Sequence, residues 1–453
     1  MASYATLPTN DTVGMAARLL DELTSKLPNK DFQVRFWNGS LWGCKASPRF
    51  TLILNNPWSL RQLFLSPSEL SVGEAFIYGD FDVEGDLEAA FEFADHLFAK
   101  ELPLTAKLRL RALAAVPRRW IKGSFRHAQP PGAADGPQRA GGLAGEDPRG
   151  RSAAETKGKR HSMQRDRSAV RYHYDVSNDF FRLFLDERMV YSCAYFKSPE
   201  DDLETAQRQK LDYLCRKLRL KPGERLLDLG CGWGGLLMHA AREYGVDAFG
   251  ITLSVPQAEL ARERIQQTGL AARCRVEVCD YREIEAEGQF DKLVSVGMFE
   301  HVGESLLSEY FSRAWELLRP GGVFLNHGIA ASASWQQKAG PSFIEKYVFP
   351  DGELVPLNTT VRVAESCGFE VQDVENLRRH YELTLRHWSA RLKAKADEAR
   401  RLTDEATYRT WRIYMAGSAH GFRLGRMNLC QLLLSKSEHG RSELPLTRED
   451  WYA

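Results

Sequence analysis

The chain has 453 residues, enough for two or three domains, with 61 basic and 60 acidic side chains and a formal net charge of +1. This balance gives no electrostatic reason to expect a nucleic-acid partner. The eight cysteines form no Cys-x-x-Cys pair, which argues against a zinc site and favours reduced thiols in the cytoplasm. We expect no metal, and we recognise neither a signal peptide nor an apolar run of membrane-spanning length.

The first 126 residues predict a small α+β domain. Apolar residues are spaced as in strands at 31–44 and 49–55, and as in a helix at 87–104. Residues 107–122 are basic and apolar together. Such a segment can lie on an anionic membrane surface, or it can pack one face on its own domain, and the sequence leaves both open.

Residues 127–168 break the periodicity. They are rich in Gly, Ala, Pro, Arg and Lys and hold almost no large apolar side chain, so they cannot bury enough surface to offset ordering entropy. We predict a flexible basic linker there, followed by one larger catalytic domain over 169–453.

Strands and helices are predicted to alternate in the larger domain. The predicted strands are 225–229, 248–251, 275–278, 292–296 and 322–326, and the helices between and before them include 207–218, 256–267 and 306–318. This alternation predicts an α/β fold with a doubly wound, Rossmann-like, mainly parallel sheet.

A glycine-rich run follows the first strand of this domain, at 230–235. A strand, a glycine turn and a helix place a ligand at the helix N-terminus, beyond the carboxyl end of the sheet. The spacing fits a dinucleotide, yet the second strand ends in Thr252 without the acid that holds a ribose. Asp228, ahead of the glycines, instead suits the ammonium group of S-adenosylmethionine. The turn therefore favours the methyl donor, with a dinucleotide or a purely structural turn as alternatives.

Six ordered motifs resemble the cyclopropane-fatty-acyl-phospholipid synthases and mycolic-acid cyclopropane synthases. They are Tyr172–Phe181, Tyr191–Phe196, Leu226–Gly235, Gly250–Ser254 with Gln257, Asp280–Arg282 and Val294–Gly303. The resemblance implies a methyltransferase domain with a mainly parallel seven-stranded sheet. More weakly, the smaller N-terminal domain resembles the lipid-associated domain of longer family members.

The resemblance also implies a reaction. A methylene group passes from S-adenosylmethionine to the cis double bond of an unsaturated phospholipid acyl chain, through a carbocation that bound bicarbonate deprotonates. An alkene is a poor nucleophile, so the donor must be held close to it, and the carbocation must be shielded from water. The alternative within the family is a fatty-acyl methyltransferase that gives a methylene- or methyl-branched chain.

Site residues carry over by their places in these motifs. The catalytic group implied is Cys193, Glu300, His327, Ile329 and Tyr381. The donor-binding residues implied are Tyr191, Asp228, Gly230, Gly232, Thr252, Leu253, Gln257, Asp280 and Tyr281. Outside the motifs, Cys193 and His327 would each be read more simply as core residues.

One position departs from the family pattern, because Cys279 stands where many members carry Gln. A thiol cannot make the paired hydrogen bonds of an amide, which weakens the expected adenine contact at that position.

The expected setting is the inner face of the membrane, to which a cytoplasmic enzyme binds peripherally, and a homodimer is plausible by resemblance. A lipid-binding protein with a vestigial methyltransferase fold is a competing reading, and the full catalytic group argues against it. An RNA methyltransferase is weaker, since no aromatic-rich RNA surface accompanies the basic linker.

Overall fold

The computed structural model divides into two compact units, each described here by itself. It describes residues 9–98 apart from 26, 28, 29, 45 and 65–67, residues 153–334 apart from 155, 156, 175 and 286, and residues 342–452 apart from 441 and 443. The basic segment 107–122 and most of the predicted linker lie outside these residues. Helix α6 (Met163–Tyr174) begins inside the predicted linker range, so that range extends too far at its C-terminal end. Among the described residues, no helix is long and apolar enough to cross a membrane.

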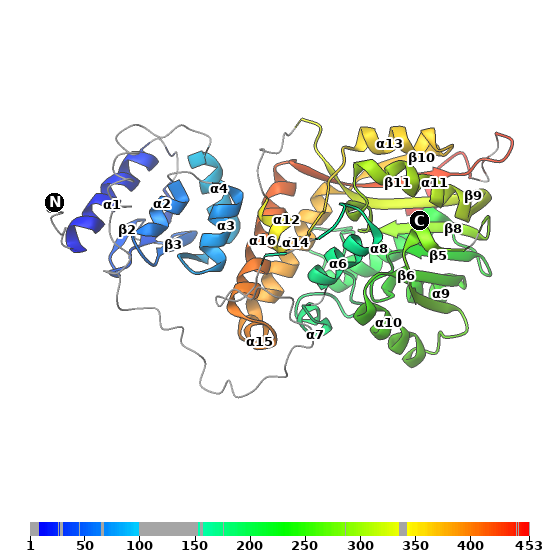
Figure 1. The fold of residues 1–453 in the computed structure, drawn as a ribbon, viewed down its shortest axis with the longest axis horizontal. Helices are drawn as coiled ribbons and strands as arrows, with labels where there is room; N and C mark the ends of the chain where they lie inside the picture. Colours follow the sequence, from blue (N-terminus) through cyan, green and yellow to red (C-terminus); the bar gives the residue numbers. More distant parts are fainter. Residues whose placement is uncertain are drawn as a thin grey trace. The chain divides into compact units, whose positions relative to one another are not determined.

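The smaller unit is an α+β domain built on a four-stranded sheet, as predicted (Figure 1). The strands are β1 (Phe32–Arg35), β2 (Leu41–Gly43), β3 (Phe50–Leu54) and β4 (Phe81–Gly85), in the order β2-β1-β3-β4. The helices are α1 (Thr9–Thr24), α2 (Trp58–Phe64), α3 (Glu69–Ile77) and α4 (Leu87–Phe98). Alternate residues of β3 are buried, as expected for a strand with one face on a core.

Two short segments from late in the sequence, 341–343 and 404–413, belong to this smaller unit. The ring of Phe343 lies so close to Gly73 that a Cβ there would come within 2.2 Å of it. Arg409 is buried, and its Nη2 lies 2.5 Å from Oδ2 of Asp82. A glycine and an ion pair therefore hold distant parts of the sequence in one core.

The larger unit contains a seven-stranded sheet in the order β10-β11-β9-β8-β5-β6-β7. Its strands are β5 (Arg225–Leu229), β6 (Asp247–Thr252), β7 (Cys274–Val278), β8 (Phe290–Val296), β9 (Leu318–Ala331), β10 (Glu370–Asn376) and β11 (Met427–Ser435). Neighbours from β9 through β7 pair in parallel, and β11 alone runs against both of its neighbours. The predicted mainly parallel sheet and its five predicted strands are confirmed, whereas the sequence reading did not identify β10 and β11.

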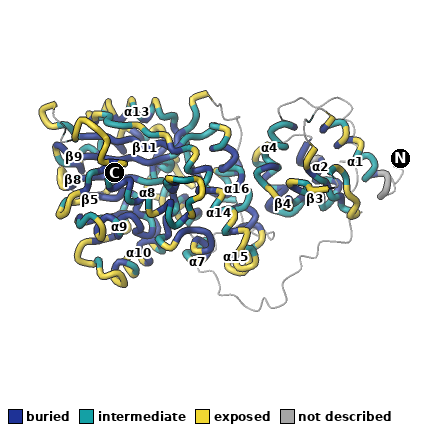
Figure 2. Tube along the Cα trace, turned by 180° about the vertical axis from the view of Figure 1, so that it is seen from behind, coloured by how far each residue is buried: buried dark blue, intermediate teal, exposed yellow. Residues whose placement is uncertain are grey.

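The seven-stranded sheet forms a buried layer within the larger unit (Figure 2). Along each strand, successive apolar residues pack on opposite faces of the sheet. Leu226 belongs to the core cluster shared with α8, α9 and α10, and Leu227 to the cluster shared with α11 and α13. Val294 and Leu293 divide in the same way. Helices therefore cover both faces, as doubly wound sheets require.

The helices of the larger unit have the following bounds: α6 (Met163–Tyr174), α7 (Asn178–Arg182), α8 (Leu203–Leu218), α9 (Gly235–Tyr244), α10 (Val255–Gln267), α11 (Leu307–Leu317), α12 (Phe343–Tyr347), α13 (Leu357–Ser366), α14 (Arg378–Ala394), α15 (Ala396–Leu402), α16 (Glu405–Arg423) and α17 (Glu449–Tyr452), the ends of α12 and α16 that fall in 341–343 and 404–413 being counted with the smaller unit. Short 3₁₀ turns cover Tyr281–Glu283, Phe299–His301 and Glu304–Leu306.

We expect Gly250→Ala to lower the free energy of unfolding by about 1–3 kcal/mol, because it overpacks the sheet beneath the glycine turn. A Cβ at Gly250 would lie 2.4 Å from Cδ1 of Leu237 and 2.7 Å from Cβ of Cys231. Urea unfolding followed by circular dichroism measures the change. Gly14→Ala in α1 is the control, since nothing lies nearer than 3.7 Å to its Cβ, and it should be neutral or stabilising. Equal midpoints for Gly250→Ala and the wild type would contradict the expectation.

Candidate active site

The glycine turn after β5 has a backbone that only glycine adopts without strain. Gly230, Gly232 and Gly234 have φ angles of 95°, 53° and 77°. A Cβ at Gly230 would lie 2.8 Å from Cβ of Met298, and one at Gly235 would lie 2.9 Å from the carbonyl oxygen of Arg188. The turn leads directly into α9, so the backbone N–H groups at that helix start are available to a ligand.

A pocket opens beside this turn, within the larger unit. All nine residues predicted to bind the donor line it, namely Tyr191, Asp228, Gly230, Gly232, Thr252, Leu253, Gln257, Asp280 and Tyr281. They come from β5 and the glycine turn after it, from the end of β6 and the start of α10, from the segment after β7 and from the segment before α8. The carboxyl ends of neighbouring parallel strands thus bring together residues that are far apart in the sequence.

Asp228 is the negative group at the pocket wall beside the turn. Its side chain is buried, and its Oδ1 has no hydrogen-bond partner among the described residues. Burial raises the pKa of Asp228 to about 7, and the positive charge of Lys210 opposes that rise. An unpartnered buried carboxylate fits an ammonium-bearing ligand, because such a ligand supplies the missing partner.

At the second strand, hydroxyl and amide groups replace the usual acid. The Thr252 hydroxyl donates to Oε1 of Gln257 at 2.9 Å, and both side chains line the pocket. Because the Gln257 amide oxygen accepts this bond, the NH₂ group of Gln257 is the donor that the two side chains offer to a ligand. Ser254 accepts from the backbone N–H of Gln257 and begins α10, so the pocket wall is tied to the helix start.

After β7, Asp280 lines the pocket with its carboxylate already engaged. Its two oxygens accept from Nε and Nη2 of Arg282 at 2.8 and 2.6 Å. Tyr281 lies beside it with the Arg282 guanidinium over its ring and with a hydroxyl that has no partner among the described residues. Cys279 also lines the pocket, but its thiol donates to the carbonyl of Asp280 at 3.2 Å.

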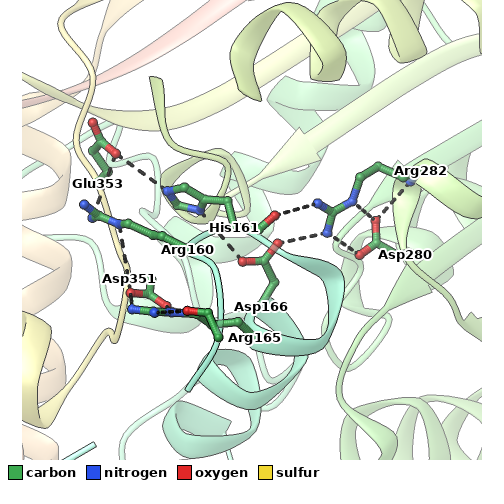
Figure 3. A network of polar contacts seen from close by, with 9 residues as sticks. Arg160, His161, Arg165, Asp166, Asp280, Arg282, Asp351 and Glu353 are labelled. Atoms are coloured by element: carbon green, nitrogen blue, oxygen red, sulfur yellow. Dashed lines mark hydrogen bonds and ion pairs between the residues drawn. The ribbon is translucent and has the colours of Figure 1, made fainter. Parts of the chain in front are cut away.

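Helix α6 closes this side of the pocket through a network of charged side chains (Figure 3). Arg282 also donates to Asp166 of α6 at 2.9 Å, and Asp166 lines the pocket. His161 lies between Asp166 and Glu353, with nitrogen–oxygen distances of 3.8 and 3.7 Å. The sequence reading placed Asp166 in the linker and so missed it.

Glu300 and Ile329 are in direct contact. The backbone N–H of Ile329 on β9 donates to Oε1 of Glu300 at 2.7 Å. The other oxygen, Oε2, is buried without a partner among the described residues. Burial raises the pKa of Glu300 to about 7, and the bond from Ile329 opposes the rise. The carboxyl group therefore exchanges a proton near neutral pH, with one oxygen held and one available.

Aromatic side chains surround Glu300. Burial raises the pKa of Tyr174, Tyr381 and Tyr414, and the Glu300 charge adds to each rise, so all four groups lie close together. Tyr381 also contacts Trp388, with ring centroids 6.0 Å apart. These rings exclude water around the one carboxyl group of the cluster.

Cys193 is close to Tyr381 of this cluster. A charge on its sulfur would raise the pKa of Tyr381. Its thiol is fully buried and is 3.2 Å from the carbonyl oxygen of Ala194. Burial raises the pKa of Cys193, so the thiol stays protonated and does not act as a nucleophile. The neighbouring backbone N–H of Ala194 donates to the hydroxyl oxygen of Thr384 at 3.0 Å.

His327 lies in the middle of β9 and not at a strand end, because the strand extends to Ala331. Its side chain is fully buried, and its Nδ1 is 3.1 Å from Nε2 of Gln431. Its own Nε2 has no partner among the described residues. Burial lowers the pKa of His327 well below the usual value, and the charges of Lys210 and Lys217 lower it further. His327 is therefore neutral at physiological pH.

Lys210 of α8 is a site residue that the sequence reading missed. It lines the pocket, is buried, and donates to Oγ of Ser192 at 2.9 Å. Burial lowers its pKa to about 8, and the nearby charges of Asp186, Cys193 and Asp228 oppose that change. It lies at helical spacing from Leu214 and Leu218 on the apolar face of the predicted helix 207–218, and a lysine on that face was the available sign.

The described residues thus include two sets of unsatisfied groups, one at Asp228 in the pocket and one at Glu300 and His327, which are not among the residues that line it. Asp228 fits the ammonium group of a methyl donor beside the glycine turn. Glu300 Oε2 and His327 Nε2 are both buried and unpartnered, and a small oxyanion that carries a proton would satisfy an acceptor and a donor together. Among the described residues, no group of His, Cys, Asp and Glu is arranged to hold a metal ion.

Several known proteins are similar to this chain over most of its length. A probable fatty acid methyltransferase of Pseudomonas putida is 39% identical and covers 93% of this chain and 96% of its own length. A probable fatty acid methyltransferase of Mycobacterium tuberculosis is 36% identical and covers 87% of this chain and 89% of its own length. The cyclopropane-fatty-acyl-phospholipid synthase of Escherichia coli is 39% identical over 58% of this chain and 66% of its own length.

Solved structures share the larger unit. The mycolic acid cyclopropane synthase CmaA1, complexed with SAH and CTAB, superposes with a TM-score of 0.56 at 36% identity, covering 59% of this chain and 97% of that one. The cyclopropane synthase MmaA2 of Mycobacterium tuberculosis superposes with a TM-score of 0.57 at 33% identity, covering 60% of this chain and 98% of that one.

Family profiles match both units. Residues 19–97 match a domain of unknown function, so a lipid-associated role for this unit stays a prediction. The mycolic acid cyclopropane synthetase profile matches residues 161–432, which hold the glycine turn, the donor pocket and the Glu300 cluster. The chain therefore belongs to the mycolic acid cyclopropane synthetase family and is an S-adenosylmethionine-dependent methyltransferase.

Proposed function

We propose that the protein is a fatty-acyl methyltransferase that methylates a double bond of an unsaturated acyl chain and gives a branched product. The observation that carries the proposal is Glu300, a buried carboxyl group with one free oxygen, set among aromatic rings and next in the chain to His301, which lines the donor pocket. Such a site suits an apolar acceptor that passes through a cation, and it offers little to a polar nucleophile.

Similarity supports the branched product over the ring that the motifs first suggested. The two relatives named as probable fatty acid methyltransferases match across both units, whereas the cyclopropane-fatty-acyl-phospholipid synthase of Escherichia coli matches 58% of the chain. We therefore take the methyltransferase reading as the leading one and ring formation as the second.

The residues have separable tasks in this reaction. S-adenosylmethionine, when bound, supplies an electrophilic methyl group: its sulfur–methyl bond breaks as a carbon–carbon bond to the alkene forms, leaving a cation on the acyl chain. Asp228 would hold the donor's ammonium group, and the faces of Tyr174 and Tyr381 would stabilise the cation and keep water away. Glu300 and His327 would hold bicarbonate, which the family resemblance implies as a base.

The product depends on which proton the cation loses. Loss from a chain carbon leaves a methyl-branched alkene. Loss from the new methyl group closes a cyclopropane ring, or leaves a methylene branch if a hydride shift has first moved the cation to the methylated carbon. The proximity of Glu300 and Cys193 to Tyr381 keeps the ring as second candidate, since ring closure needs a base close to the transferred methyl group.

We propose further that phospholipids present the acyl chain, so the enzyme works at a bilayer surface without spanning it. The test uses the full chain, trideuteromethyl-labelled donor, and vesicles of a monounsaturated phosphatidylglycerol, with the free monounsaturated fatty acid in parallel. Mass spectrometry of the lipids should show one added carbon that keeps all three deuterium atoms when a chain carbon loses the proton, and two when the new methyl group loses one. Mild hydrogenation over palladium, which reduces an alkene and leaves a cyclopropane ring intact, then separates a branched alkene from the ring. Transfer to neither lipid overturns the proposal.

Replacing Glu300 should abolish turnover while leaving donor binding intact. We expect Glu300→Gln to lower kcat by about 10²–10⁴-fold, because the amide cannot take up or relay a proton. In the wild type, kcat at saturating donor should rise with pH through about 7, since the raised pKa keeps the carboxyl group neutral below that value. The exposed Glu304→Gln in the same loop is the control and should behave as the wild type. Full turnover by Glu300→Gln would rule out its role.

Removing the charge of Asp228 should weaken the donor site alone. We expect Asp228→Asn to weaken S-adenosylhomocysteine binding by about 10–100-fold, the range for a lost charge-assisted hydrogen bond. Wild-type affinity should fall below about pH 7, where Asp228 becomes neutral, and the variant should lose that pH dependence. Isothermal titration calorimetry measures both. Asp247→Asn, at the opposite end of β6 and exposed, is the control. Unchanged binding by Asp228→Asn would exclude the assignment.

A further inference from the structure

His327 lies at the end of a hydrogen-bond chain that the catalytic group does not include. The register of β9 and β11 pairs His327 with Gln431, and Nε2 of Gln431 is 3.1 Å from Nδ1 of the histidine. Oε1 of Gln431 accepts from Nζ of Lys217 on α8 at 3.0 Å. All three side chains are fully buried, so no solvent competes for these bonds.

Lys217 is held in one place by its surroundings. Besides Gln431, its ammonium group contacts Oε2 of Glu375 at 2.7 Å and Oδ2 of Asp373 at 3.3 Å. An ammonium group has three N–H donors, and three acceptors meet them here. The rings of Tyr213 and Trp451 each lie with their centroids 5.0 Å from Nζ. The Gln431 amide therefore meets a cation that can only donate.

This cation determines the orientation of the amide. Lys217 has no acceptor, so Gln431 must present its oxygen to the lysine and its NH₂ group to His327. The NH₂ group donates, so Nδ1 of His327 must accept and carry no hydrogen. The single ring hydrogen of the neutral imidazole is then on Nε2, the nitrogen without a protein partner. A proton on Nδ1 would set two donors against each other in a buried space.

We propose that Lys217 and Gln431 are positioning residues that hold His327 as the neutral tautomer protonated at Nε2. His327 then donates a hydrogen bond into the site and does not take the proton that the substrate cation loses. Proton removal falls to Glu300 and to any anion that Glu300 and His327 hold between them. This inference rests on the proposed function only for what His327 donates to, because the tautomer itself is a property of the protein.

The tautomer can be observed directly in the full-length protein. Long-range ¹H–¹⁵N correlation spectra of deuterated protein labelled with ¹⁵N-histidine distinguish a protonated from an unprotonated ring nitrogen, and loss of one signal set in His327→Gln assigns the resonances. The wild type should show His327 protonated at Nε2 alone. Protonation at Nδ1, or a mixture of tautomers, overturns the inference.

Gln431→Glu tests the hydrogen-bond chain from Lys217 through Gln431 to His327 with almost no change in side-chain shape. The new carboxylate still accepts from Lys217, but its other oxygen can only accept, so the ring hydrogen should move to Nδ1. We expect kcat to fall by about 100-fold, the range for a lost oxyanion donor, with S-adenosylhomocysteine affinity unchanged. Gln372→Glu on β10 is the matched control, since its amide bonds to Ser435 on the strand edge. Gln431→Glu with the wild-type tautomer, or with wild-type kcat, overturns the inference.

Lys217→Met provides a second variant if Gln431→Glu fails to fold. Without the cation the Gln431 amide is free to turn over, so both tautomers of His327 should appear and kcat should fall by about 10-fold, as for a lost single hydrogen bond. A pure Nε2-protonated spectrum in this variant contradicts the role of Lys217. Absence of lipid methylation by a wild type with the expected tautomer counts against the proposed function alone.

Discussion

The carboxyl ends of β5, β6 and β8 meet at one edge of a parallel sheet, and the chemistry of this protein depends on that edge. The end of β5 carries Asp228, the end of β6 carries Thr252, and the 3₁₀ turn after β8 carries Glu300. Their side chains belong together only because parallel pairing brings these ends side by side. Glycine is required where the segments pack closely, as at Gly230, where a Cβ would lie 2.8 Å from Cβ of Met298.

Burial then sets the ionisation of the groups at this edge. It raises the pKa of Asp228 and of Glu300 to about 7 and lowers that of Lys210 to about 8, so three groups change charge close to neutral pH. The same desolvation keeps Cys193 protonated and His327 neutral. The site thus combines exchangeable carboxyl groups with donors that do not titrate, which suits removal of a proton from a cation in an apolar enclosure.

Much of the fold followed from periodicity. The predicted strand 225–229 coincides with β5, and the other four predicted strands lie within β6 to β9. The pattern does not predict β10, because its two valines, Val371 and Val374, are three residues apart among polar side chains and no residue of the strand is fully buried. It does not predict β11 either, because an apolar run near the end of the chain carries no local sign of the strands that it pairs with. It could not assign Phe343 and Arg409 to the smaller unit, since local pattern does not report contacts between distant segments.

The sequence by itself determined the family, the donor and the residue types of the site, because ordered motifs such as 226–235 and 294–303 report local turns and the side chains on them. Only the tertiary structure decided which of these groups are unsatisfied and which are already engaged. Asp280 is engaged by Arg282, whereas Glu300 keeps one oxygen free. The hydrogen-bond chain of Lys217, Gln431 and His327 joins α8, β11 and β9, so it depends on strand register and helix packing. A hydrogen bond between distant segments depends on distance in space, which no local pattern contains.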